Sequence, residues 1–524
     1  MMNDILQYNL VRESLLKVRR ADGRRESVSL TQVFSGLADG NIVSFEALQP
    51  HQKQPWYCFL VQLAVIALSR DDRSQLPVSP EVWEELLLNL TNGKKAPWSL
   101  IVEDISLPAF MQPPVPESSL EDAKYKPDVA TPDELDILIT SKNHDLKQHR
   151  ISSPRPEHWI YALVALQTLE GFLGRGNYGI VRMNGGFGNR PFVAITSEFG
   201  WSARFRRDVS VLLQARKEIL NQYGYDDSGH ALLWLLPWDG AKTSGIPLEE
   251  CDPLFIEICR RIRFRSENTQ IKCYRANTKG TRVSAPDELN GVTGDPWTPI
   301  DISDAKALTV GGNGFSYQLL HDILLSDEYA QCAAMKPTQK EKDGGFLIAT
   351  TLVRGQGKTE GFHHRVVPIP PHATKLFSSV SEREKLGKIA AERIDTAETV
   401  QRNILYPALR SLLSAGSDEN VDSEKIQPGM RSFDAAVDAV FFEDLWESLK
   451  IPREKARRQW QERLYEFARD ELEKSIESTP LPSMRRYRAI STARSIFYGN
   501  ARRQLSALFP QDQTEESHEQ LAGC

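Results

Sequence analysis

A chain of 524 residues is longer than a single hydrophobic core usually supports, so two domains are expected. Its hydrophobic content of 40% and charged content of 26% are ordinary for a soluble globular protein. The net charge of −6 argues mildly against a nucleic-acid-binding protein, unless its basic residues are clustered.

The six cysteines, at positions 58, 251, 259, 273, 332 and 524, contain no C-x-x-C pair, which is unlike a disulfide scaffold. Residues 1–17 mix charged with apolar side chains and do not resemble a signal peptide. No run of about 18 apolar residues exists to span a membrane. A reduced, cytoplasmic protein is therefore expected.

The first elements predicted are a hairpin and a helix. Asp22-Gly23 lies between the strand-like runs 15–18 and 27–30, as a turn dipeptide does in a β-hairpin. Ser29 and Thr31 can both cap a helix that begins near Gln32.

Two further helices are predicted in the first half of the chain. Residues 56–69 are apolar on nearly all sides, which indicates a buried helix, and residues 157–173 have apolar residues at helical period. Between them, residues 107–135 are rich in proline and acid, and we expect them to lie at the surface rather than in the core.

Beyond Ser379 the chain becomes helical, with segments 381–414, 433–449, 452–477 and 483–508 separated by short connections. Ser432 is the predicted N-cap of the second segment. Four such helices suggest an antiparallel bundle. The predicted fold is α+β: a large mixed α/β N-terminal domain, residues 1–375, followed by a C-terminal four-helix bundle, residues 376–524.

Gly174-Arg175-Gly176-Asn177-Tyr178-Gly179 matches the dinucleotide-binding fingerprint G-x-G-x-x-G. A predicted helix precedes it where the fingerprint requires a strand, so nicotinamide binding is not expected. A glycine-rich backbone can approach another polymer closely, with Arg175 and Arg182 available for phosphates. The alternative is a structural glycine turn.

Residues 354–359, Arg-Gly-Gln-Gly-Lys-Thr, resemble the end of a Walker A loop, but Leu352 replaces its first glycine. No ATPase is predicted. The strand-like runs 346–349 and 365–367 flank this polar stretch, which predicts a hairpin whose tip can enter a nucleic-acid groove. The alternative is an exposed, solvated turn.

His-Asp dipeptides occur at His144-Asp145 and His321-Asp322. A metal-dependent nuclease of the HD type needs a further His and a distant Asp, which the sequence does not assign. A polar loop at residues 142–150 that contacts phosphate or a neighbouring subunit is the favoured interpretation.

The last predicted helix is strongly basic. Between Pro482 and Gln511 there is no acidic residue, and the six arginines are Arg485, Arg486, Arg488, Arg494, Arg502 and Arg503. Such a run is typical of polyanion contact. The alternative is neutralisation by glutamates of the same bundle, such as Glu471, Glu473 and Glu477.

Several segments, in this order, resemble the large subunit of the type I-E CRISPR Cascade complex, the CasA family. They are Asn9-Leu10-Val11 with the following hairpin, Pro108-Ala109-Phe110-Met111-Gln112, the glycine-rich stretch from Asn177 through Asn184-Gly185-Gly186 to Arg190-Pro191, and Ala493-Arg494 in the last helix.

The resemblance implies a DNA-recognition subunit without catalytic activity, which reads a protospacer-adjacent motif (PAM) and starts strand separation. The implied PAM-reading residues are Gly174, Arg175, Gly176, Asn177, Tyr178, Gly179 and Lys279. The implied wedge is Arg354, Gly355, Gln356, Gly357, Lys358 and Thr359. The residues implied to contact the guide RNA or a neighbouring subunit are Lys142, Asn143, His144 and Lys147. For the basic helix we expect Arg485, Arg488 and Arg494 to face the DNA path or an adjacent subunit.

The resemblance also implies partners: double-stranded target DNA, the crRNA, a small-subunit dimer, backbone and handle-binding subunits, and a helicase-nuclease. No cofactor is expected. Some relatives carry a paired-cysteine metal site after a Cys-Asp-Pro element; here Cys251-Asp252-Pro253 is present but no C-x-x-C follows, so no zinc or other metal is predicted. An HD-type nuclease and a structural adaptor that never contacts DNA are the two alternative functions.

Overall fold

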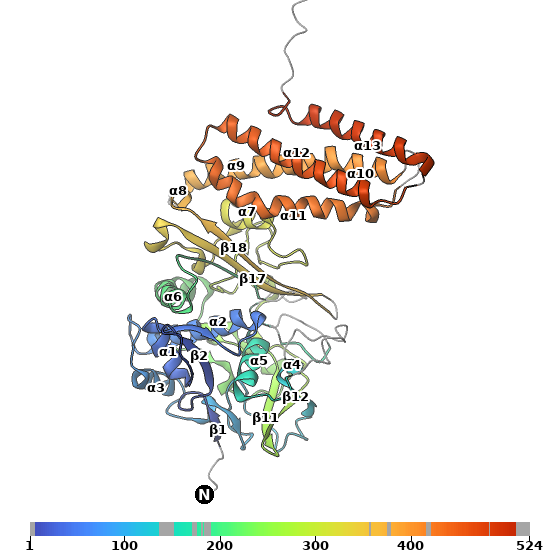
Figure 1. The fold of residues 1–524 in the computed structure, drawn as a ribbon. Coiled ribbons are helices and arrows are strands. Elements are labelled where there is room, and N and C mark those ends of the chain that lie inside the picture. The colour runs from blue at the N-terminus through green and yellow to red at the C-terminus, as the bar shows by residue number, and fades with distance from the viewer. Residues whose placement is uncertain are drawn as a thin grey trace, which may run out of the picture. The chain divides into compact units, whose positions relative to one another are not determined.

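The computed structural model describes residues 6–135, 151–169, 175–179, 182, 190–355, 358–374, 379–414, 421–481 and 483–509. These residues pack as two compact units, each visible in Figure 1. The first comprises the described residues of Met1–Phe315 and Asp327–Val367, and the second those of Ser316–Ser326 and Pro368–Cys524. Within the described part, no helix has both the length and the apolar character needed to cross a membrane.

The first unit combines helices with small sheets, each of two or three strands in the described residues. Its helices are Leu30–Ala38 (α1), Lys53–Arg70 (α2), Pro80–Asn89 (α3), Pro132–Leu135 (α4), Pro156–Leu169 (α5) and Trp201–Tyr223 (α6). Its strands are Leu6–Asn9 (β1), Leu16–Arg20 (β2), Arg25–Val28 (β3), Ile42–Phe45 (β4), Ser99–Val102 (β5), Lys126–Val129 (β6), Phe192–Thr196 (β7), His230–Leu232 (β8), Ile246–Pro247 (β9), Cys251–Ile256 (β10), Arg261–Glu267 (β11), Gln270–Ala276 (β12), Val283–Ser284 (β13), Ile300–Asp301 (β14), Lys306–Ala307 (β15), Tyr329–Ala330 (β16), Gly345–Gly355 (β17) and Lys358–Ile369 (β18).

The predicted N-terminal hairpin is confirmed. β2 and β3 pair antiparallel with Leu16 opposite Val28, and Gly23 in the turn adopts a φ of +86°, which glycine reaches without steric cost. Ser29 caps α1 in a capping box: the Gln32 amide donates to the Ser29 hydroxyl at 3.3 Å, and the Ser29 amide donates to the Gln32 side chain at 2.9 Å.

The core of the first unit is built around α2 and α5, both predicted from the sequence. α2 packs against α5, α6 and β10, which explains why its side chains are apolar on nearly all sides. Trp56 on α2 and Trp159 on α5 are fully buried.

The expectation of a surface excursion over residues 107–135 is wrong in part, because residues 109–115 are buried. Phe110 and Met111 join the main core. The buried Gln112 side chain donates to the carbonyl of Leu100 at 2.8 Å and accepts from the amide of Phe264 at 2.8 Å. Proline lacks an amide proton, so a proline-rich stretch can enter a core with few backbone donors to satisfy.

The predicted hairpin in the second half of the first unit is confirmed, and its strands are longer than the sequence indicated. β17 spans Gly345–Gly355 and β18 spans Lys358–Ile369 (Figure 1). The sheet order is β18-β17-β7. β17 pairs antiparallel with β7, with Phe346 opposite Thr196 and Thr350 opposite Phe192.

The second unit contains the predicted helices (Figure 1). Its helices are Tyr317–Leu325 (α7), Pro371–Thr374 (α8), Val380–Thr399 (α9), Tyr406–Leu413 (α10), Ser423–Ser448 (α11), Arg453–Ser478 (α12) and Ser483–Gln504 (α13), and of these α7 and α8 were not predicted from the sequence. A π-helical segment, Val400–Leu405, joins α9 to α10 without a break, so the predicted segment 381–414 is one continuous helix. The predicted α+β fold with C-terminal helices is confirmed.

The prediction that Ser432 caps a helix is wrong. α11 begins ten residues earlier than predicted, at Ser423, where the Asp422 side chain accepts from the Glu424 amide. Ser432 lies inside α11 and its hydroxyl donates to Glu471 at 2.6 Å. Pro428 suggests a helix break, but Ile426 and Met430 on either side of it are buried, and this packing holds the helix together.

Candidate nucleic-acid interface

The described part of the predicted glycine loop, residues 175–179, is fastened to the segment that contains Lys279. The Thr278 amide donates to the carbonyl of Gly176 at 2.9 Å, and the Tyr178 amide donates to the Thr278 hydroxyl at 2.9 Å. Thr278 is buried, so both bonds are shielded from water. The structure therefore brings together two stretches that are about a hundred residues apart in the chain. Gly174 lies outside the described residues.

Lys279 is held by its backbone while its side chain is exposed. Its amide donates to the carbonyl of Gly240 at 2.7 Å. Gly240 has a φ of +78° and approaches the backbone of Thr278 closely. Lys279 thus exposes its side chain to solvent from a backbone position that is fixed, and Arg175 in the glycine loop is also exposed.

Gly176 and Gly179 have different surroundings. Gly176 is part-exposed with a φ of +83°, and an added Cβ would meet only the side chain of Asn277, at 3.0 Å. Gly179 is buried, and an added Cβ would lie 2.0 Å from the carbonyl oxygen of Cys259. Glycine is required for packing at Gly179 and for backbone conformation at Gly176.

Sequence reasoning missed a residue behind this loop, Arg261 on β11. Its side chain is buried, and Nη1 donates to the carbonyl of Asn277 at 3.5 Å. The guanidinium also lies 5.0 Å from the ring centroid of Tyr125 and 3.6 Å from the Glu117 carboxylate. Burial raises the pKa of Tyr125, and the nearby Arg261 opposes that rise. Arg261 occupies a strand of alternating arginines, so only the tertiary structure distinguishes it from its neighbours.

Arg182, which we expected to be available for phosphates, is buried instead. Its guanidinium donates to the carbonyl of Phe255 at 2.7 Å and lies 3.4 Å from Glu257. Arg190 pairs with Asp295 at 2.6 Å in the same buried cluster. Burial raises the pKa of Glu257, and the two arginines oppose that shift. The cluster is buried inside the first unit and therefore offers no surface to a ligand.

In the segment predicted to act as a wedge, the turn between the two strands is shorter than the sequence suggested. Arg354 and Gly355 belong to β17, while Lys358 and Thr359 belong to β18, so four of its six residues are in strands rather than in a turn. Gln356 and Gly357 lie outside the described residues.

The predicted guide-RNA contacts, Lys142, Asn143, His144 and Lys147, also lie outside the described residues. The second His-Asp dipeptide is structural. His321 is buried, with Nδ1 at 2.8 Å from Asp322 and Nε2 at 3.2 Å from the carbonyl of Gly387. The described residues contain no group of three or more His, Cys, Asp and Glu side chains arranged to hold a metal ion. Cys251 is buried, and burial raises the pKa of its thiol to about 12.

The three arginines of α13 that were predicted to face DNA or a subunit fall into two groups. Arg494 donates to Glu473 of α12 at 2.9 Å, which is the neutralised arrangement considered from the sequence, and this contact raises the pKa of Arg494. Arg485 and Arg488 are exposed at the start of the helix, beside Tyr487, which is 91% exposed.

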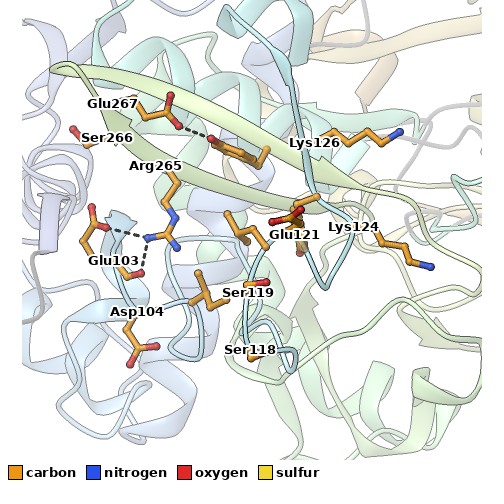
Figure 2. Close-up of a pocket in the computed structure, with 14 residues that line it drawn as sticks. Glu103, Asp104, Ser118, Ser119, Glu121, Lys124, Lys126, Arg265, Ser266 and Glu267 are labelled. Atoms are coloured by element: carbon orange, nitrogen blue, oxygen red, sulfur yellow. Dashed lines mark hydrogen bonds and ion pairs between the residues drawn. The ribbon is translucent and has the colours of Figure 1, made fainter.

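A charged pocket of about 990 Å³ lies beside β11 and β12 (Figure 2). Arg265 pairs with Glu103 at 3.0 Å, and the Tyr274 hydroxyl donates to Glu267. Its lining contains Glu103, Asp104, Glu121 and Glu267 against Lys124, Lys126 and Arg265. Opposite charges are therefore nearly balanced there, and the predicted site residues are not in the lining.

Comparison with known proteins gives one family and several solved structures. The family model for CRISPR-associated protein Cse1 matches residues 9–470. Thermus thermophilus CasA (Cse1) superposes with a TM-score of 0.58 at 15% identity over 96% of this chain and 100% of that one. Thermobifida fusca Cse1 superposes with a TM-score of 0.63 at 13% identity over 97% and 100%. A chain of a CRISPR RNA-guided surveillance complex superposes with a TM-score of 0.54 at 12% identity over 94% and 100%. The comparison with curated proteins gave no match.

Proposed function

Because this chain belongs to the CRISPR-associated Cse1 family, we propose that it is the DNA-recognition subunit of a crRNA-guided type I-E Cascade complex. In this role it reads the PAM of double-stranded DNA and helps to start strand separation, without catalysing a reaction. The observation that carries the proposal is the attachment of the glycine loop to the segment that bears the exposed Lys279.

The chemistry of the loop suits the minor groove of DNA. Minor-groove patterns are degenerate, so a backbone-rich loop and one lysine can read a short motif loosely while the guide RNA reads the sequence. The β17–β18 hairpin supplies an extended element that can separate base pairs next to the motif. Unstacking a base step costs a few kcal/mol, which contacts to the bent duplex offset.

The proposal also implies a set of partners. The chain binds the target duplex as part of a complex with the crRNA, a small-subunit dimer, and backbone and handle-binding subunits. It also supports recruitment of the helicase-nuclease. The CRISPR RNA-guided surveillance complex among the similar structures supports this assignment.

The test compares Lys279→Ala with the wild type in the assembled complex, on duplexes with preferred and non-preferred flanking motifs. We expect affinity for the preferred duplex to fall about tenfold, the effect of losing one base-edge contact, with little change on the non-preferred one. Lys272→Ala, on the strand that leads to this segment, is the control. Wild-type target binding after combined loss of Lys279, Arg354, Gln356 and Lys358 would instead indicate a structural adaptor.

A further inference from the structure

Three basic side chains from three elements gather on the first unit, and none of them was singled out in the sequence. Lys53 begins α2, Arg204 lies near the start of α6, and His364 lies in the middle of β18. We call these three residues the basic cluster. Among the residues that the structure describes, none of the three forms an ion pair with a carboxylate.

Arg204 and the start of α2 meet at two aromatic rings. The guanidinium of Arg204 lies 4.4 Å from the ring centroid of Tyr57 and 5.4 Å from that of Phe192. Tyr57 follows Lys53 by four residues, and residues four apart lie on the same side of a helix. Lys53 therefore lies on the side of α2 that Arg204 contacts.

A hydrogen bond places His364 beside the same rings. Nδ1 of His364 lies 3.0 Å from the hydroxyl of Thr350 on β17, and Thr350 is opposite Phe192 in the sheet. Burial lowers the pKa of His364, and the positive charges of Arg204 and Lys53 lower it further. Both cations therefore lie close enough to act on the imidazole.

The donors of the basic cluster are not used up by partners in the described part of the chain. The nearest acid along α6, Asp208, is buried and accepts from the Tyr57 hydroxyl and from Arg207, each at 2.8 Å. The side chain of Arg204 contacts rings and forms no hydrogen bond with a described residue. Since a guanidinium has five N–H donors, Arg204 keeps them for a ligand, as Lys53 keeps its ammonium. Like charges held together repel one another, and a bound anion relieves that repulsion.

The basic cluster is open to solvent and rests on buried side chains. Lys53 and His364 are exposed and Arg204 is partly exposed, whereas Tyr57 and Thr350, which they adjoin, are buried. An anion that approaches from solvent thus meets donors from three elements. Arginine holds a phosphate through two parallel hydrogen bonds, and lysine adds a point charge. Where Nδ1 of His364 accepts from Thr350, Nε2 carries the proton and supplies a further donor.

β18 connects the basic cluster to the tip of the hairpin. His364 follows Lys358, the first residue of β18, by six positions, which correspond to about 20 Å of strand. A stacked nucleic-acid strand covers that length in about six phosphates at ~3.4 Å each. A strand that is separated at the tip can therefore run along the hairpin to the cluster.

We propose that the basic cluster binds one backbone phosphate of a DNA strand that has been separated at the β17–β18 hairpin. The inference rests on the proposed function, which brings a melting duplex to this hairpin. The phosphate belongs to the target strand or to the displaced strand, since both present the same group. Phosphate contacts carry no sequence information, so the cluster holds the opened strand without reading it.

The test combines a double variant with neutral phosphates in the assembled complex. Lys53→Gln/Arg204→Gln removes two charges and keeps polar side chains. In the target duplex, a methylphosphonate replaces one phosphate at a time, at successive positions next to the flanking motif on each strand. We expect the double variant to bind the unmodified duplex about tenfold more weakly, as for loss of a hydrogen bond to a charged group. Its salt slope between about 50 and 200 mM should be lower by about 1, because one phosphate contact is lost.

The scan of neutral phosphates identifies the ligand. At one position, the methylphosphonate should weaken wild-type binding about as much as the double variant does, and it should leave binding by the variant unchanged. The strand that carries this position is the source of the phosphate. A scan in which every position weakens the wild type and the variant alike would overturn the inference.

The matched control is Arg19→Gln/Lys217→Gln, which removes the same two residue types at exposed positions of the same unit. Lys53→Gln alone retains the contact of Arg204 with Tyr57, so weaker binding by this variant does not come from a lost ring contact. Equal losses in the two double variants would contradict the assignment.

A variant of the basic cluster that binds DNA normally but no longer joins the other subunits would also contradict it, because the ligand would then be an acidic protein surface. Motif preference separates this inference from the proposed function. The double variant should keep the wild-type preference between flanking motifs, whereas Lys279→Ala should lose it. If Lys279→Ala keeps the preference while the scan still finds the phosphate, only the assignment of motif reading fails.

Discussion

At the scale of single residues, Gly176 and Gly179 are expected to respond differently to substitution. Gly179→Ala places a Cβ against the backbone of Cys259 and should destabilise the chain by about 1–3 kcal/mol. Gly176→Ala costs the left-handed conformation, about 1–2 kcal/mol, and displaces only the side chain of Asn277. Chemical denaturation of the two variants measures the difference.

Gly176→Leu should in addition weaken binding to the preferred duplex, because its side chain would project where the backbone is proposed to approach DNA. Normal binding of the preferred duplex by a folded Gly176→Leu variant would move the site elsewhere. For Gly179, the packing against the backbone of Cys259 makes a loss of stability the expected result of a bulky substitution.

Arg261 is expected to position the Lys279 segment rather than to contact DNA. Arg261→Met keeps the volume of the stem but removes the donor to Asn277 and the partner of Glu117. Motif preference should decrease about tenfold, as expected for loss of one hydrogen bond to a charged group, while affinity for single-stranded target stays unchanged.

The matched control for Arg261 is Arg265→Met, because Arg265 lies on the same strand and also pairs with a glutamate. Arg261→Lys should restore part of the preference by returning a donor. Equal losses of preference in the two methionine variants would show that Arg261 acts only through general stability.

At the scale of elements, the β17–β18 hairpin is expected to act in strand separation. Gln356→Ala with Lys358→Ala should slow duplex opening about tenfold, because contacts at the tip no longer offset the few kcal/mol of unstacking. Binding to a target that is already melted should change little. Stopped-flow fluorescence of a base analogue next to the motif measures the opening rate, and equal losses on both substrates would argue against a wedge.

The two groups of arginines on α13 are likewise expected to separate. Arg485→Glu with Arg488→Glu should weaken DNA binding by the assembled complex and reduce its salt slope by about 2, since each phosphate contact adds roughly one unit. Base preference should stay constant, because phosphate contacts position the protein without specifying sequence.

Arg494 provides the internal comparison within α13. Arg494→Gln breaks an exposed pair with Glu473 and should cost less than about 1 kcal/mol of stability. An unchanged salt slope in the Arg485/Arg488 variant would mean that the start of α13 contacts no nucleic acid.

At the scale of the whole molecule, the chain enters the helical unit twice, first as α7. Tyr317 at the start of α7 is buried, with its ring 4.8 Å from that of Phe441 and its amide donating to Asp438 at 2.6 Å. Tyr317→Ala should therefore destabilise the helical unit by about 3–5 kcal/mol. Tyr487→Ala, at an exposed position of the same unit, is the control, and equal melting temperatures would contradict the assignment of α7 to this unit.

Local sequence patterns determined several turns, caps and helices of this protein. The Asp22-Gly23 turn, the capping residue Ser29, the apolar surface of α2 and the C-terminal helices follow from signals within a few residues, because turn geometry, caps and helical periodicity are local properties. The order of short motifs was enough to suggest the family, and the segments with Gly176 and Lys279, both predicted, do meet.

Only the tertiary structure decided the remaining features. It buried residues 109–115 and Arg182, and it placed α7 with the helical unit. It also gave Arg261 its contact with Asn277. The physical reason is that burial, hydrogen-bond partners and charge clustering depend on which distant segments become neighbours, and no local pattern encodes that choice.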